Sequence, residues 1–167
     1  SNNIASNLNT HSLGCWGNAY GRIEIDCAKY PRSVYRWKFA VNAPEITIGI
    51  DSKSRCPDST YCFTRQSKCD KSKFYAFGSG GHLESHDIDL SLALMTSLHH
   101  RYGASTYIGD TVTMILDTGQ RTLRYLQNQT DLGIAFDNID TSKVYRMAVS
   151  LYLQSSSVEL VDFTFSS

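Results

Sequence analysis

Short segments in which apolar and polar residues alternate recur along this chain. The clearest runs from Val34 to Val41, where Tyr35, Trp37, Phe39 and Val41 fall on one side of an extended chain. The same spacing returns in Ile46/Ile48/Ile50, Val112/Met114/Leu116, Leu123/Tyr125 and Met147/Val149/Leu151/Leu153. A period of two is the pattern of a half-buried β-strand. The sequence therefore predicts a fold built from many short strands.

The segments between these runs are short and rich in turn-forming residues. Pro44, Asp117–Gln120 and Asn128–Asp131 mark turns, and Gly78-Ser79-Gly80-Gly81 ends a strand predicted over residues 74–77. Further strands are predicted over 132–136 and 158–165. Consecutive strands joined by tight turns pair antiparallel, and no strand–helix–strand spacing occurs. We expect an all-β antiparallel sandwich, with one short helix or 3₁₀ turn over residues 88–99, where Leu90, Leu94 and Leu98 lie four apart.

The length and the net charge of the chain limit the classes of protein to which it can belong. With 167 residues the chain fits one domain, predicted over 14–167 after a polar, flexible lead-in over 1–13. Sixteen basic and sixteen acidic residues cancel, so a global field that attracts nucleic acid or an anionic membrane is not expected. No apolar run approaches the ~20 residues of a membrane span, and the first residues lack a secretory signal pattern.

Five cysteines lie at positions 15, 27, 56, 62 and 69. An odd number at irregular spacing favours free thiols in a reducing compartment, which predicts a cytoplasmic protein. Zinc sites use close cysteine pairs, and the gaps here are wider than that pattern. We therefore expect neither a metal nor another cofactor.

The sequence also lacks an intact catalytic pattern. Glu24-Ile25-Asp26 resembles the start of a glycosidase strand, but Ala28 stands where a second glutamate would be. Retaining hydrolysis needs two facing carboxylates, so an enzyme is not expected.

Residues 52–73 form a long polar segment with six Lys or Arg and two Asp. One interpretation is a solvated loop, since charge runs usually face water. The other is a rim for an acidic partner, in which Arg55 and Arg65 bind carboxylates and Tyr61 and Tyr75 act as aromatic anchors.

Several motifs occur in an order that resembles the SPRY domain family. They are Tyr35-Arg36-Trp37-Lys38-Phe39, Ile48-Gly49-Ile50, Tyr102-Gly103, Gly109-Asp110-Thr111-Val112, Leu132-Gly133-Ile134-Ala135-Phe136, Tyr145 to Leu151 and Val158-Glu159-Leu160. The chain departs from the family at Gln129, where Asn-Gly is common. Leu153 stands where the SOCS-box subfamily has a Trp, and Glu84 or Ser85 stands near that subfamily's Tyr.

The resemblance implies a bent, concanavalin-like jelly roll of two antiparallel sheets, whose loops at one end bind a partner protein or short peptide without catalysis. Many family members select substrates for ubiquitin ligases. The predicted partner surface combines loops 52–73, 78–87 and 98–105 with 152–156. Its candidate residues are Arg55, Tyr61, Arg65, Tyr75, Glu84, His86, Tyr102 and Leu153. A glycan-binding, lectin-like domain is the alternative, since similar sandwiches bind sugars.

Overall fold

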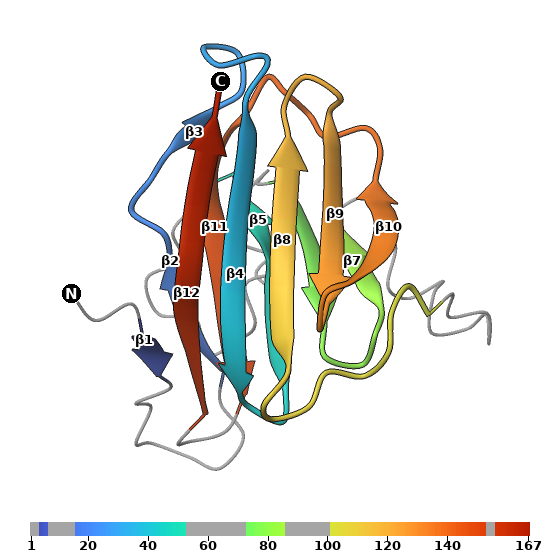
Figure 1. The fold of residues 1–167 in the computed structure, drawn as a ribbon. Helices are drawn as coiled ribbons and strands as arrows, with labels where there is room; N and C mark the ends of the chain where they lie inside the picture. The colour runs from blue at the N-terminus through green and yellow to red at the C-terminus, as the bar shows by residue number, and fades with distance from the viewer. Residues whose placement is uncertain (1–3, 7–15, 53–72, 86–100, 153–155) are drawn as a thin grey trace.

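The computed structural model describes residues 4–6, 16–52, 73–85, 101–152 and 156–167 (Figure 1). Over these ranges the chain is all-β, and the described residues contain no helix. The helix or 3₁₀ turn predicted over residues 88–99 lies outside them.

Two antiparallel sheets stack face to face (Figure 1). The first sheet has the order β1-β12-β4-β8-β9-β10, with bounds Ile4–Ser6, Ser157–Ser166, Val34–Asn42, Thr111–Asp117, Thr122–Gln127 and Thr130–Phe136. The second has the order β2-β11-β5-β6-β7, with bounds Trp16–Tyr20, Val144–Tyr152, Ile46–Asp51, Phe74–Gly78 and Leu83–Ser85. The short strand β3, Ile25–Asp26, also pairs with β11. The predicted antiparallel sandwich is confirmed.

The core lies between the sheets and follows the alternation of the sequence. On β4 the side chains of Tyr35, Trp37, Phe39 and Val41 are all buried, whereas Arg36 points outward and is exposed. Opposite them in space, Ile46, Ile48 and Ile50 of β5 are also buried. Burying one apolar side chain of this size contributes about 1.5–3 kcal/mol, so this interior is the main source of stability.

The second sheet departs from the half-buried pattern. Every residue of β5 and of β6 is buried, so the outer face of these strands is also shielded from solvent. Phe74, Ala76 and Ala148 form a small apolar cluster on that face, with Trp16 packed against it. Gly49 allows a close approach of the neighbouring strand, because a Cβ there would lie 2.2 Å from the Tyr75 carbonyl oxygen.

Three details differ from the sequence-based expectation. Within the range predicted as a lead-in, Ile4–Ser6 form β1, which pairs with β12. The strands β2, β3 and β7 are too short or too irregular in pattern to be seen as alternation. β10 begins at Thr130 because the preceding turn has only two central residues, Asn128 and Gln129, both with positive φ.

Antiparallel pairing decides which loops share an end of the sandwich. In the β5–β6 pair, Asp51 faces Phe74 at one end and Thr47 faces Gly78 at the other. The connection leaving Asp51 and the turn following Gly78 are therefore at opposite ends. We call the end with the β4–β5 turn, the β6–β7 turn and the loop before β8 the groove end; it is the lower end in Figure 1.

Candidate functional site

An open groove of about 790 Å³ lies at the groove end of the sandwich. Three segments that are distant in the sequence build it: the β4–β5 turn, the β6–β7 turn and the loop that precedes β8. Its lining residues are Pro44, Glu45, Ser79, Gly80, His82, Ser105, Thr106, Tyr107 and Ile108.

Two large apolar side chains project at this groove. Tyr107 is 68% exposed and Ile108 is 63% exposed, the highest values among the exposed large hydrophobic residues of the described chain. Both belong to a tight turn in which the Asp110 amide donates to the Tyr107 carbonyl at 3.0 Å. Gly109 adopts φ +95° in this turn, a conformation that favours glycine. The turn thus holds two apolar side chains in water instead of burying them.

Hydrogen bonds from three directions hold this turn in place. The Asp110 carboxylate accepts bonds from the Tyr107 amide at 2.8 Å and from the Asn128 side chain at 2.8 Å. The Gly109 amide donates to the Val41 carbonyl and the Thr106 amide to the Ser79 carbonyl. Burial alone would raise the pKa of Asp110, but the bonds from Asn128, Tyr107 and Gln127 outweigh it and lower the pKa. Asp110 is therefore an ionised residue whose hydrogen bonds stabilise the turn, a role that Asp often has in turns.

The β6–β7 turn forms another wall of the groove. A Cβ at Gly81, which has φ +81°, would lie 2.2 Å from the Gly103 carbonyl oxygen, so only glycine fits there. The Tyr102 and Gly103 amides both donate to the Gly81 carbonyl, which ties this turn to the loop before β8. The His82 ring approaches the buried Glu84 carboxylate, with Nε2 and Oε1 3.1 Å apart. The His82 side chain itself remains 45% exposed.

The described residues among the predicted partner-binding set have structural roles. Tyr75 is only 5% exposed and packs in the core against Phe136 and Tyr145, so its proposed role as a surface anchor is incorrect. Its position on β6 turns the side chain toward the other sheet, which the pattern Phe-Tyr-Ala-Phe does not distinguish from the outer face. Glu84 is also buried and contacts His82.

Tyr102 is half-buried and contacts residues of three strands, β6, β9 and β10. Its hydroxyl donates to the Gly133 carbonyl at 2.6 Å and accepts from the Tyr125 amide at 3.1 Å, while its ring packs on Phe77. Burial raises the pKa of Tyr102 to about 12, so the hydroxyl stays protonated. Arg55, Tyr61, Arg65, His86 and Leu153 lie outside the described residues.

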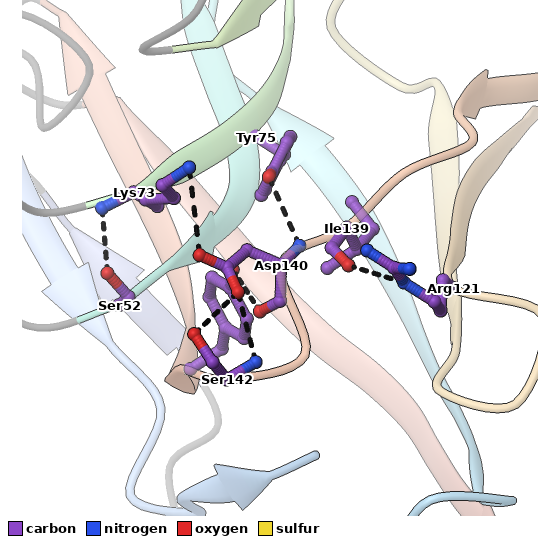
Figure 2. Close-up of polar contacts among 8 residues, drawn as sticks. Ser52, Lys73, Tyr75, Arg121, Ile139, Asp140 and Ser142 are labelled. Atoms are coloured by element: carbon purple, nitrogen blue, oxygen red, sulfur yellow. Dashed lines mark hydrogen bonds and ion pairs between the residues drawn. The ribbon is translucent and has the colours of Figure 1, made fainter. Parts of the chain in front are cut away.

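The described flanks of the loops predicted to form the partner surface do not all lie at one end of the sandwich. Ser52 and Lys73, which flank segment 53–72, lie at the end opposite the groove, where they exchange backbone and side-chain hydrogen bonds (Figure 2). There the Lys73 ammonium lies 3.6 Å from the Asp140 carboxylate, which also accepts bonds from Ser142. Loops 78–82 and 101–105 do meet at the groove. Tyr152 lies at the same end, where its amide donates a hydrogen bond to the Glu45 carbonyl.

Sequence reasoning missed the groove residues Glu45, Tyr107 and Ile108. The available signal was the Tyr-Ile pair directly before Gly109-Asp110, an apolar pair that belongs to no alternating segment. In the part of the chain that the structure describes, no group of three or more His, Cys, Asp or Glu gathers as metal ligands would. Nor do these described ranges hold a helix with the length and apolar character of a membrane span.

Comparison with known proteins identifies the class to which this sandwich belongs. The SPRY domain model matches residues 34–164, so the chain belongs to the SPRY family. A search of curated proteins finds no match.

Solved structures share the fold at low sequence identity. The SPRY domain of human HERC1 is 19% identical, with a TM-score of 0.59 over 94% of this chain and 86% of that one. Another human SPRY domain is 10% identical, with a TM-score of 0.63 over 95% and 91%. The potassium-bound carbohydrate recognition domain of Emp46p is 12% identical, with a TM-score of 0.56 over 92% and 79%.

Proposed function

We propose that this SPRY domain binds an extended segment of another protein in the groove, and that it acts by binding alone and not by catalysis. The observation that carries this proposal is the pair Tyr107 and Ile108, which are strongly exposed and yet held by a hydrogen-bonded turn. A turn whose backbone is already held by hydrogen bonds loses little backbone entropy when a partner covers its exposed side chains. Membership of a family of protein-interaction modules agrees with this reading.

The energetics favour these two side chains as the main anchors. Covering an exposed Tyr or Ile gains about 1.5–3 kcal/mol each, whereas rim contacts in water contribute little. The walls around them are made largely of backbone and small polar side chains, such as Ser79, Gly80 and Thr106. Such walls can hydrogen-bond to a peptide main chain while Tyr107 and Ile108 contact its side chains.

Peptide selection followed by calorimetry tests the proposal. Short random peptides displayed on phage are selected on the wild-type domain, and the affinity of the selected peptides is measured for the Tyr107→Ser/Ile108→Ser variant. We expect at least tenfold weaker binding by the variant, because the lost apolar contact exceeds about 1.4 kcal/mol.

The matched control is Tyr30→Ser/Ile134→Ser, which removes an exposed Tyr and an exposed Ile (40% and 58% exposed) outside the groove. Thermal unfolding should be similar for both variants. Equal peptide affinity of the wild type and the groove variant would refute the proposal. Binding on a glycan array that survives the groove substitutions would favour the lectin-like alternative, for which the Emp46p domain offers likeness of fold alone.

The wider role is a further part of the proposal. We extend it to substrate recognition within a ubiquitin ligase or another larger complex, supported by family resemblance. Affinity purification of the tagged chain, with the groove variant in parallel, tests this role. We expect the wild-type sample to contain a ligase subunit together with a ubiquitylated client protein. The variant sample should retain the subunit but lose the client.

A further inference from the structure

The charge of the groove indicates which kind of segment it accepts. Glu45 is exposed in the lining, and the lining residues that the structure describes include neither Lys nor Arg. The Asp110 carboxylate, which its hydrogen bonds keep ionised, accepts a bond from the amide of Tyr107. Glu84 stands beneath the exposed ring of His82. Glu45 thus lines the groove and two further carboxylates lie behind it, while the described lining residues contribute no permanent cation.

The sequence around the groove has the same bias. In the described residues 74–85 and 101–110, the acidic residues are Glu84 and Asp110, and Arg101 is the one Lys or Arg. Arg101 is exposed and precedes Tyr102, whose amide donates to the Gly81 carbonyl. In a chain whose formal net charge is zero, this is a local excess of negative charge.

The opposite end of the sandwich carries charges of both signs. Lys29, Arg32 and Arg121 are exposed in loops at that end, and Lys73 and Lys143 are partly exposed there. Carboxylates lie beside them. Asp26 accepts from the amides of Ala28 and Lys29, Asp117 from those of Gly119 and Gln120, and Asp140 from that of Ser142. Cations and carboxylates are therefore mixed there, whereas the described lining of the groove holds Glu45 and neither Lys nor Arg.

From this asymmetry we infer that the groove recognises a basic-apolar peptide: an extended segment in which a Lys or Arg lies beside a large apolar side chain. The inference rests on the proposed function and names the chemistry of its partner. The apolar side chain packs on Tyr107 and Ile108, and the cation pairs with the Glu45 carboxylate. Arg suits this site better than Lys, because its guanidinium binds a carboxylate in a bidentate manner and stacks on an aromatic ring.

The peptide selection described above also tests this inference when Glu45 is varied. We expect Lys or Arg to be enriched next to an apolar residue in peptides selected on the wild-type domain. Glu45→Gln should weaken their binding roughly 3- to 10-fold and reduce its dependence on salt concentration, because an exposed charge pair is screened by salt. Glu45→Lys should shift selection away from basic peptides and toward acidic ones.

The control is Asp137→Asn, which removes an exposed carboxylate directly after β10, at the end opposite the groove. It should leave affinity and salt dependence unchanged. Peptides that require Tyr107 and Ile108 but show no basic enrichment would overturn the inference and leave the proposed function intact. Basic enrichment that Glu45→Gln does not weaken would overturn it as well. Selection of no peptide sensitive to Tyr107 and Ile108 would overturn both.

Discussion

The Tyr125 hydroxyl donates a hydrogen bond of 3.0 Å to the carbonyl oxygen of Ile48. Tyr125 lies on β9 of the first sheet and Ile48 on β5 of the second, so this bond crosses the interior of the sandwich. Both residues are buried, and burial raises the pKa of Tyr125 well above its usual range. The hydroxyl therefore stays protonated at neutral pH and can donate this bond.

Tyr125→Phe tests how much this hydrogen bond between the sheets contributes to stability. The substitution keeps the ring and its contacts with Phe77 and Tyr102 but removes the hydroxyl. We expect a loss of about 1–2 kcal/mol in the free energy of unfolding, because a buried carbonyl loses its side-chain donor. Chemical denaturation measures it, with Tyr30→Phe as the exposed control. An equal stability of the two variants would contradict this role.

Asp51 predicts an unusual dependence of stability on pH. Its side chain is 3% exposed, and its Oδ1 atom has no hydrogen-bond partner in the structure described. Burial raises the pKa of this carboxyl from 3.8 to about 6, against a smaller opposing effect of the Ser52 amide. Because the folded state favours the protonated form, this contribution is complete below pH 3.8 and is lost as the pH rises through 6.

Asp51→Asn should remove that loss. We expect the variant to be more stable than the wild type by about 2 kcal/mol at pH 7.5, with the difference shrinking toward pH 4. Urea denaturation across this pH range measures it. A constant difference between the two proteins at all pH values would show that Asp51 is not the titrating group.

Gln129 occupies a backbone conformation that suits glycine. Asn128 and Gln129 have φ of 49° and 72°, the pair of positive values that defines the type I′ hairpin turn. Asn tolerates this region, and Asn128 also accepts from the Thr111 amide, but a glutamine gains no such compensation. Gln129→Gly should therefore stabilise the domain by about 0.5–1 kcal/mol.

The measurement for this turn is the thermal midpoint of unfolding. The comparison variant is Thr130→Gly, which places glycine on the adjacent strand residue and should destabilise the domain. A lower midpoint for Gln129→Gly would mean that this turn is not the one the structure shows.

Gly49 predicts an intolerant position in the second sheet. An alanine Cβ there would lie 2.2 Å from the Tyr75 carbonyl oxygen and 2.8 Å from the Ala76 Cα, both backbone atoms of a buried strand. Gly49→Ala should cost about 3 kcal/mol or more, or prevent folding. Gly21→Ala is the control, since its Cβ would meet Met147 at an ordinary 3.4 Å. Soluble yield and thermal unfolding compare them, and similar behaviour of the two variants would refute the predicted close approach.

The alternation of apolar residues predicted the strands that matter most for the core. Tyr35, Trp37 and Phe39 are buried as their spacing indicates, because a strand turns every second side chain to the same face. The same rule could not place Tyr75. Both faces of β6 are buried, so its sequence of Phe, Tyr, Ala and Phe contains no polar face from which to read orientation.

The groove was beyond prediction for a different reason. Glu45, His82 and Tyr107 are separated by many residues in the chain, and only strand pairing brings their loops to one end. The basic segment 52–73 was assigned to the same surface on the basis of composition. Its flanks, Ser52 and Lys73, lie at the other end. The reason is that the connections before and after β6 leave from opposite ends of that strand.

By itself the sequence determined the kind of fold, through local alternation, turn residues and the ordered SPRY motifs. The tertiary structure decided which loops meet, which tyrosines are buried and where the two ends of the molecule differ in charge. The physical reason is that side-chain alternation is a property of each strand alone, whereas the grouping of loops depends on hydrogen bonding between strands far apart in the chain.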